Sequence, residues 1–178
     1  MNNYIVLLRG INVGGHKKLP MQLLRDLLTQ NGYQNVRTYI QSGNVFLESN
    51  KKETLEISIH IKQLITKEFG YDVPVITLTK KEIEKCALTN PYLAIEEDFK
   101  KLHVIFLNQT PDANLIADIA GFKSGNDAFT IIDNFIFIHY PDNSRNSKLS
   151  AAFFEKKLHL KASARNWRTV LKLKELSQ

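Results

Sequence analysis

Two short polar segments of this sequence carry the side chains best suited to binding a ligand. Cationic groups can neutralise an anion, amides and hydroxyls can orient it, and glycines let it approach backbone amides. The first segment supplies Arg9, Asn12, Gly14, Gly15 and Lys17, and the second supplies Gln41, Ser42 and Asn44. These residue types together favour a site for a phosphate or a carboxylate.

The same segments are less suited to other chemistry. They contain no carboxylate, so magnesium-dependent phosphoryl transfer and paired-carboxylate hydrolysis have no evident ligands. The P-loop ending and the GxGxxG fingerprint are missing, and Ser42 lacks a G-x-S-x-G context. His16 could act as an acid or base, although a lone loop histidine is more often simply solvated. We assign no catalytic residue.

A purely structural interpretation stays open. Gly10, Gly14 and Gly15 could merely permit a tight turn, and Asn12 and Asn44 could merely hydrogen-bond the backbone. The two interpretations differ in whether these groups serve a ligand or the fold.

Metal and cofactor sites are not expected. The five histidines show no i, i+4 pairing and no HExxH context. Cys86 is the single cysteine, so we expect a buried small hydrophobe and neither an intrachain disulfide nor a cysteine metal cluster. No apolar run approaches the roughly 18 to 20 residues of a membrane span, and residues 1–4 lack the features of a signal peptide. We therefore expect a cytoplasmic protein without membrane partners.

The positive charge is concentrated near the C-terminus. Of the 24 Lys and Arg and the 18 Asp and Glu, nine and three lie in residues 141–178, so the remaining fifteen of each kind balance. Such a basic segment attracts nucleic acid or other phosphate-bearing partners, or acidic proteins. A solvated helix surface is the simpler alternative.

The elements that position the two polar segments follow from apolar patterning. The first segment lies between a buried strand and a helix that Pro20 opens and Asn31-Gly32 ends. The second joins two short strands with Ser-Gly-Asn chemistry that suits a hairpin. The expected strands are 4–9, 36–40, 45–47 and 73–78, the last with Pro74 at an edge or strand beginning, and the expected helices are 20–30 and 54–69.

A second, similar run follows. Thr79 and Glu82 have capping-box spacing, so a short helix should reach about Leu88. Strand 102–107, helix 111–119, strands 129–132 and 135–138 around Asp133-Asn134, and helix 149–158 then repeat a shortened β-α-β-β-α order. A final helix is expected from about Ala164 to Leu176.

Consecutive strands joined by tight hairpins favour a mainly antiparallel sheet over a parallel doubly wound one. We therefore predict an α+β protein of two ferredoxin-like (βαββαβ-type) lobes with a C-terminal closing helix. The predicted domains are residues 1–95 and 96–178, with the boundary at the acidic stretch 96–98. In this topology the first strand ends beside the hairpin of the second and third, so the two polar segments should meet.

Several motifs resemble those of domain-of-unknown-function family 1697. They are Leu8-Arg9-Gly10-Ile11-Asn12-Val13-Gly14-Gly15, Lys18-Leu19-Pro20-Met21, Tyr39-Ile40-Gln41-Ser42-Gly43-Asn44-Val45, Ser147-Lys148-Leu149 and Ser163-Ala164-Arg165-Asn166-Trp167-Arg168-Thr169-Val170. They span essentially the whole chain in order. Ser163 departs from the threonine frequent in the family, and both residues can cap a helix. The resemblance implies a two-lobed α+β fold and no established substrate.

Residues 163–167 could bind a ligand as well as begin a helix. Arg165 and Asn166 are candidate phosphate contacts, and Trp167 could stack a base, although a core role for Trp167 is favoured. Ser147 and Lys148 read first as a helix start, with phosphate contact as the alternative.

Three functions follow, in order of preference. The first is an anion- or phosphate-binding module that recognises nucleic acid or a nucleotide, although the motifs of RRM and KH domains are absent. The second is an enzyme acting on a small phosphorylated or carboxylated substrate, with His16 or Ser42 taking part. The third is a protein-interaction module that uses a sheet edge or the basic C-terminal helix.

Overall fold

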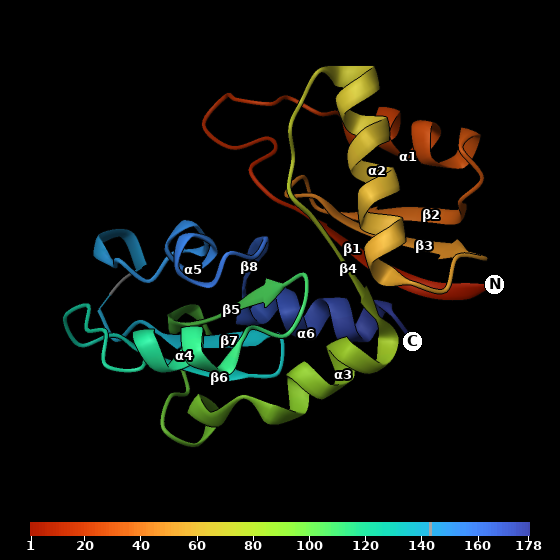
Figure 1. The fold of residues 1–178 in the computed structure, drawn as a ribbon. Coiled ribbons are helices and arrows are strands. Elements are labelled where there is room, and N and C mark those ends of the chain that lie inside the picture. Colours follow the sequence, from red (N-terminus) through yellow and green to blue (C-terminus); the bar gives the residue numbers. More distant parts are fainter. Residues whose placement is uncertain (143) are drawn as a thin grey trace. The chain divides into compact units, whose positions relative to one another are not determined.

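The computed structural model describes residues 1–142 and 144–178. Its residue contacts divide the chain into unit 1, Met1–Glu82 with Ser177–Gln178, and unit 2, Ile83–Leu176. Each unit contains a four-stranded antiparallel sheet with helices (Figure 1), which confirms the predicted two-lobed α+β fold. The domain boundary predicted after residue 95 stays a prediction, because this division shows which residues pack together and not which segments fold alone.

Unit 1 has the order βαββαβ, and its strands lie in the order β2-β3-β1-β4. Every neighbouring pair is antiparallel, as a split βαβ arrangement requires. The elements are β1 (Asn2–Leu8), α1 (Met21–Gln30), β2 (Gln34–Tyr39), β3 (Asn44–Ser49), α2 (Thr54–Phe69) and β4 (Val75–Thr79), followed by α3 (Lys80–Thr89).

The core of unit 1 forms where both helices cover one face of the sheet (Figure 1). Side chains alternate along a strand, so Tyr4, Val6 and Leu8 of β1 point to this face. The helices meet them with apolar stripes, including Leu24 of α1 and Ile61 of α2, both fully buried. The period-2 and period-3.6 patterns of the sequence therefore produce one shared core.

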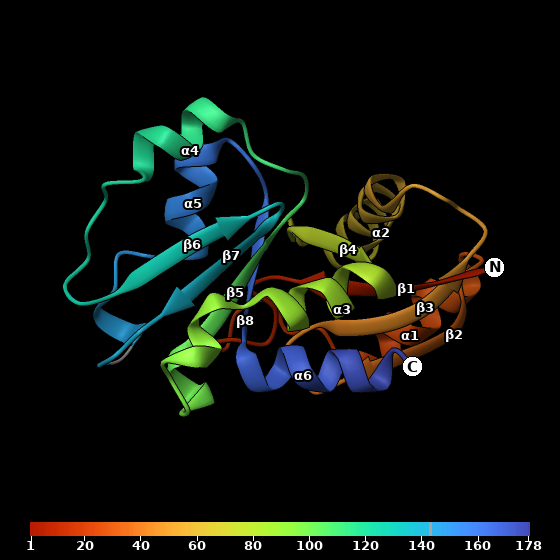
Figure 2. The same cartoon turned by 90° about the horizontal axis from the view of Figure 1, so that it is seen from below.

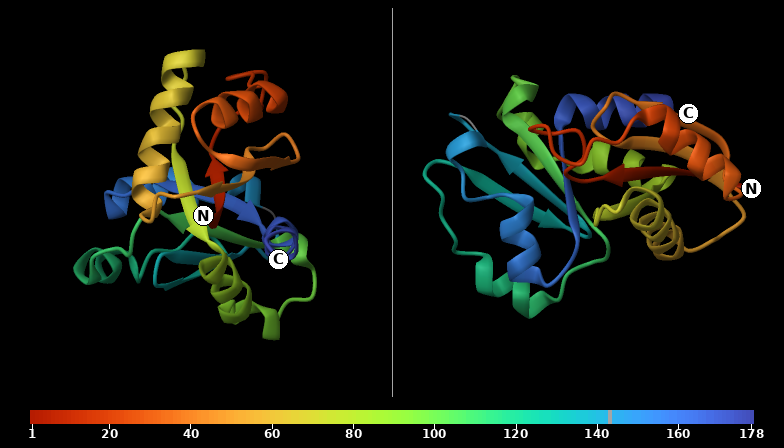
Figure 3. Two further views of the ribbon diagram at one scale, coloured as in Figure 1. Left: turned by 90° about the vertical axis from the view of Figure 1, so that its right-hand side faces the viewer. Right: turned by 90° about the horizontal axis from the view of Figure 1, so that it is seen from above.

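Unit 2 contains a second complete βαββαβ order, with strands arranged β6-β7-β5-β8. Figures 2 and 3 show its helices α4 and α5 together, and residues of both join the core of the sheet. The elements are η1 (Pro91–Ala94), η2 (Phe99–Lys101), β5 (Leu102–Leu107), α4 (Ala113–Ile119), β6 (Ala128–Ile132), β7 (Phe135–His139), η3 (Ser144–Asn146), α5 (Ala151–Leu158), β8 (Ala162–Asn166) and α6 (Trp167–Leu176).

The expected helix from Ala164 was wrong at its beginning, and the second lobe is not shortened. Residues 162–166 form β8, which pairs antiparallel with β5 from Leu107↔Ala162 to His103↔Asn166. The edge of β5 that β7 leaves open needs backbone partners, and β8 supplies them. Because β8 precedes the helix, the cap of α6 is Asn166, whose Oδ1 accepts a hydrogen bond from Arg168 N at 2.9 Å, and not Ser163.

Several local signals act as the sequence predicts. Glu82 Oε2 accepts from Thr79 N at 2.7 Å and Thr79 Oγ1 accepts from Glu82 N at 3.2 Å, which is the predicted capping box. Gly70 ends α2 with φ 70°, and Asp133 takes φ 53° in the two-residue hairpin. Cys86 and Trp167 are both fully buried, as expected, and burial raises the pKa of the Cys86 thiol.

The two units build the same sheet edge with matching backbone hydrogen bonds. In unit 1, Leu8 N donates to Gly43 O at 2.8 Å, and in unit 2, Leu107 N donates to Asn134 O at 2.9 Å. The next residue repeats the match, since Arg9 N donates to Pro74 O at 3.1 Å and Asn108 N donates to Lys161 O at 3.0 Å. These pairs place the first strand, the hairpin and the last strand of each unit in equivalent positions.

The connections at this edge differ in length. Unit 1 joins β1 to α1 through residues 9–20 and β2 to β3 through residues 40–43, whereas unit 2 uses only residues 108–112 and 133–134. Among the described residues, none of the helices is both long and apolar enough to cross a membrane.

Candidate functional site

The structure brings the two polar segments of unit 1 together at one end of the sheet. Asn12 Nδ2 donates to Gln41 O at 2.9 Å, and the Leu8 to Gly43 hydrogen bond joins the same two segments at their base. We call residues 9–20 and 40–44 the polar edge. The expected meeting of the β1–α1 loop with the hairpin is therefore present.

Asn12 holds the polar edge in shape. Its Oδ1 accepts from Leu19 N at 2.8 Å, while Nδ2 donates to Leu19 O and Gln41 O at 2.9 Å each. Asn12 also takes φ 55°, a left-handed conformation that asparagine tolerates better than most residues. Its side chain thus fastens both ends of the loop and the hairpin, which is the backbone-bonding role considered for it.

Asn44 is used in a similar way. Its side chain is fully buried, and Nδ2 donates to Tyr39 O at 3.2 Å and to Ser42 Oγ at 3.0 Å. The amide therefore fixes the turn and the Ser42 hydroxyl together. Of the predicted site residues, Asn12 and Asn44 shape the polar edge, while Gln41 is exposed and Ser42 is partly exposed.

Gly43 is required by packing. It has φ +79°, and a Cβ there would lie 2.7 Å from Leu8 Cβ and 3.0 Å from Ile11 Cδ1. The hairpin therefore presses against the end of β1 and the start of the loop. This close approach explains the Ser-Gly-Asn sequence better than turn geometry alone does.

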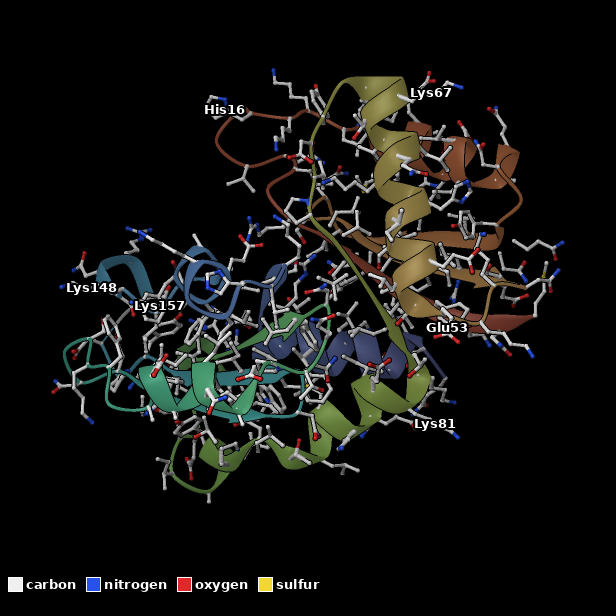
Figure 4. The ribbon with its side chains drawn as sticks, viewed as in Figure 1. His16, Glu53, Lys67, Lys81, Lys148 and Lys157 are labelled. Carbon is white, nitrogen blue, oxygen red and sulfur yellow. The ribbon has the colours of Figure 1, made fainter. Side chains whose placement is uncertain are left out.

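The tip of the loop is a small, exposed turn. Val13 and His16 form an isolated bridge, with His16 N donating to Val13 O at 3.1 Å. Gly14 and Gly15 lie between them with φ 59° and 79°, and nothing approaches a Cβ at Gly15 within 4 Å. Figure 4 shows His16 at the outer end of this loop, above the sheet of unit 1.

The polar edge also contacts the segment before β4, through Lys17 and Lys18. Lys17 Nζ donates to Asp72 O, and Tyr71 OH donates to Lys18 O at 3.3 Å. The Asp72 carboxylate itself pairs with Lys62 at 2.8 Å. Arg9 is half-buried at the base of the loop. The polar edge therefore has cationic side chains on a backbone that these hydrogen bonds hold in place.

The N-terminus of α1 adds positive potential to this end. Pro20 precedes the helix with φ −60° and makes no side-chain cap, and the first turn contains no acidic residue. The first amides of a helix carry a partial positive charge that a carboxylate normally offsets. Here no such side chain is present in the first turn.

The remaining predicted residues lie in unit 2. Arg165 is 8% exposed, and its Nη1 donates to Ser163 Oγ at 3.0 Å and to Ala164 O at 2.8 Å. Burial lowers the pKa of Arg165 to about 10, which leaves the guanidinium charged at neutral pH. Asn166 Nδ2 reaches Phe99 O at 3.3 Å in addition to its capping role. Arg165 therefore bonds within β8, the strand that the sequence did not predict, and Asn166 joins the end of β8 to η2 and to the start of α6.

Ser147 and Lys148 serve the entry to α5. Ser147 Oγ accepts from Leu149 N at 3.0 Å, and Lys148 N donates to Ser124 Oγ at 2.9 Å. The cap of α5 is Ser150, whose Oγ accepts from Phe153 N at 3.2 Å. Ser147 and Lys148 therefore lie at the start of a helix, as the first interpretation of these residues had it.

Two titratable pairs were not singled out from the sequence. Tyr33 OH lies 2.9 Å from His60 Nδ1, and burial raises the pKa of Tyr33 to about 12 and lowers that of His60. In unit 2, His139 Nε2 lies 3.0 Å from Glu96 Oε2. Partners so distant in the sequence share no motif, so only the fold could reveal them. Across residues 1–142 and 144–178, no group of three or more His, Cys, Asp or Glu side chains could hold a metal ion.

Fold and site together define a protein of two split βαβ units, one of which carries an elaborated polar edge. The chain belongs to the family described as "Protein of unknown function (DUF1697)", whose model matches residues 1–137. A similar solved structure is that of the conserved bacterial protein SP0830 from Streptococcus pneumoniae, with a TM-score of 0.75 and 22% identity over 99% of this chain and 98% of that one. That likeness shows the fold alone. None of the curated proteins compared with the chain matches it.

Proposed function

We propose that unit 1 is an anion-binding module that recognises the phosphate of a nucleotide or nucleic acid at the polar edge, in the cytoplasm. The observation that carries the proposal is the difference between two equivalent edges. Unit 2 closes the same strand ends with residues 108–112 and 133–134, so the fold does not need the longer connections of unit 1.

The chemistry of the extra residues supports an anion as the ligand. Arg9, His16, Lys17 and Lys18 can carry positive charge, and residues 9–20 and 40–44 contain no Asp or Glu. The glycine turn and the uncapped start of α1 add backbone amides, which bind phosphate oxygens in many proteins. Asn12 preorganises the loop, so binding would cost little further ordering.

In this proposal, Arg9 and Lys17 neutralise the ligand, while Gln41 and Ser42 orient it. Asn12 and Asn44 act indirectly by holding the loop and the Ser42 hydroxyl in place. Gly14 and Gly15 form the exposed turn that could close over a bound phosphate. The proposal includes no catalytic residue and needs no cofactor.

The test is a thermal-shift series with nucleotides, sugar phosphates, small carboxylates and short RNA and DNA oligomers at low and high salt. A ligand at 100 times its dissociation constant adds about 2.7 kcal/mol of stability, or roughly 5–10 °C for a chain of this size. We expect a phosphate ligand to raise the melting temperature of the wild type but not of Arg9→Ala. Arg168→Ala removes the same charge from an exposed position of α6 and should respond like the wild type.

Each outcome has a distinct meaning. A shift with oligomers alone that disappears at high salt would identify nucleic acid as the ligand class. A shift with small phosphorylated or carboxylated compounds that survives salt would turn attention to the enzyme alternative. No shift with any anion would contradict the proposal and leave protein interaction as the function to test.

A further inference from the structure

The edge of unit 2 that is equivalent to the polar edge contains an open hollow of about 540 Å³. Its lining includes Asn108 and Gln109 after β5, Glu155 and Lys156 of α5, and His159 and Lys161 before β8. The volume lies within the range of small-molecule sites. Three elements of one unit therefore converge on a basic and amide-rich surface.

Two hydrogen bonds keep the walls of this hollow together. Asn108 Oδ1 accepts from Lys161 N at 2.9 Å, and Glu155 Oε1 accepts from Ala162 N at 2.9 Å. The first bond reinforces the backbone contact from Asn108 N to Lys161 O. The second bond turns the Glu155 carboxylate toward the backbone of β8. One of its oxygens is therefore already hydrogen-bonded when an anion enters the hollow.

The side chains left for a ligand can each donate a hydrogen bond. Within the described part of the chain, no side-chain hydrogen bond or ion pair engages Gln109, Lys156, His159 or Lys161. Lys156 lies in the last turn of α5, where a cation also stabilises the helix dipole, so its position alone has a structural explanation. Lys161 and His159 lie beyond the helix, and His159 takes a left-handed φ of 54°. His159 is the C-cap of α5, where a positive charge would also interact with the helix dipole, whereas Lys161 lies further along the chain and the dipole does not explain its position.

We infer that this hollow is a second anion site, which holds a phosphate group between Lys156 and Lys161 with the side-chain amides of Gln109 and Asn108 as further donors. It is independent of the polar edge of unit 1, because every residue that lines it belongs to unit 2. The local charge excess of residues 141–178 makes a phosphodiester chain or a phosphate ester the matching chemistry.

The test removes two charges in each of two places. The variant Lys156→Gln with Lys161→Gln changes the hollow, and Lys67→Gln with Lys81→Gln removes equal charge from exposed positions of α2 and α3, labelled in Figure 4. Binding of a fluorescent single-stranded oligonucleotide is measured by anisotropy over a salt series. Two lost phosphate contacts should reduce the slope of log affinity against log salt by about 1.4. The control pair should leave it unchanged.

Amide chemical shifts on titration with inorganic phosphate and with AMP separate the two phosphate sources. Perturbations of residues 159–162 by either small ligand in the wild type, lost in the hollow variant, support a discrete phosphate site. Perturbation by the oligonucleotide alone supports a surface at the same residues that binds the phosphodiester backbone of nucleic acid. An equal response of the hollow variant and the control pair overturns the inference, as does the absence of perturbation by all three ligands.

Arg9→Ala, measured beside these variants, separates this inference from the proposed function. If Arg9→Ala loses phosphate binding and the hollow variant behaves like the wild type, the inference of a second site is contradicted and the proposal for unit 1 stands. The reverse pattern would keep the second site and contradict the proposal for unit 1.

Discussion

Units 1 and 2 meet the same structural demand with different amounts of chain. Both dock the end of a first strand against a hairpin and a last strand through the same two backbone hydrogen bonds, with lengths that agree within 0.1 Å (2.8 and 2.9 Å, 3.1 and 3.0 Å). Unit 2 completes this edge with short connections. Unit 1 adds a loop and a longer hairpin, and the side chain of Asn12 ties them to each other.

The difference shows which connections the fold requires and which residues of unit 1 are additional to them. In unit 1 the hairpin can lie close to β1 only because Gly43 has no side chain, whereas the equivalent Asn134 of unit 2 keeps its own and reaches Leu107 O at 3.5 Å. The longer hairpin therefore demands a residue without a side chain at a position where the shorter one accepts asparagine. The proposed function of the polar edge rests on this difference between two matching edges.

The largest difference between the two units is expected at the hairpins. Gly43→Ala adds a Cβ at a left-handed φ and at 2.7 Å from Leu8 Cβ, so we expect a loss of roughly 2–4 kcal/mol in the free energy of unfolding. Asn134→Ala keeps a Cβ that is already accommodated and should cost about 1 kcal/mol or less. Chemical denaturation measures both. Equal losses would mean that the two hairpins are packed alike.

The next test concerns the asparagines that follow the first strand of each unit. Asn12→Ala removes three hydrogen bonds to backbone groups, and we expect a cost of about 1–3 kcal/mol. Asn108→Ala removes the single bond to Lys161 N and should cost about 0.5–1.5 kcal/mol. Hydrogen exchange should accelerate at residues 12–19 in Asn12→Ala and not at residues 45–47. Unchanged exchange in the loop would show that Asn12 does not hold it.

A smaller, pH-dependent effect distinguishes unit 2. The hydrogen bond from His139, followed by that from Asp98 N, lowers the pKa of Glu96 from 4.5 to about 2. Since the pKa is depressed in the folded state, the stabilisation is present above pH 4.5 and is lost as the pH falls toward 2. Glu96→Gln should therefore melt below the wild type at pH 5, with the gap closing by about pH 2. Glu97→Gln, at the exposed neighbouring position, should show no such trend.

The smallest effects should be equal in the two units. Lys62 pairs with Asp72 at 2.8 Å in unit 1, and Lys85 pairs with Asp133 at 2.6 Å in unit 2, all with largely exposed side chains. Lys62→Gln and Lys85→Gln should each cost no more than about 1 kcal/mol, and less at high salt. Urea denaturation at two ionic strengths measures this. A loss of several kcal/mol for either would show that surface charge, and not packing, distinguishes the units.

Most of the fold could be predicted because local signals agree with tertiary ones. The apolar stripe of α2, its glycine stop at Gly70 and the Thr79–Glu82 capping box all act within a few residues. Strand β8 could not be predicted in the same way. Its sequence Ala-Ser-Ala-Arg-Asn has little strand propensity, and the residues form a strand because β5 offers an open edge.

The candidate site was predictable in its location and less so in its roles. Strand order alone brings residues 9–20 beside 40–44, since β1 and β3 are antiparallel neighbours. The spacing of Asn12 and Asn44 could not reveal that their amides are occupied by Leu19, Gln41 and Tyr39, because these contacts depend on the loop path. The hollow of unit 2 had no motif, since its lining comes from three separate elements.

The strand order of each sheet also affects how the chain reaches its native state. During synthesis, β1 emerges before the other strands of unit 1, yet it gains its second neighbour only when β4 arrives after the whole of α2. In the same way, β5 must wait for β8. Until then, each of these apolar strands exposes an unpaired edge, which is a template for pairing with another chain. Newly made protein should therefore be most prone to self-association just before residues 75–79 and 162–166 leave the ribosome.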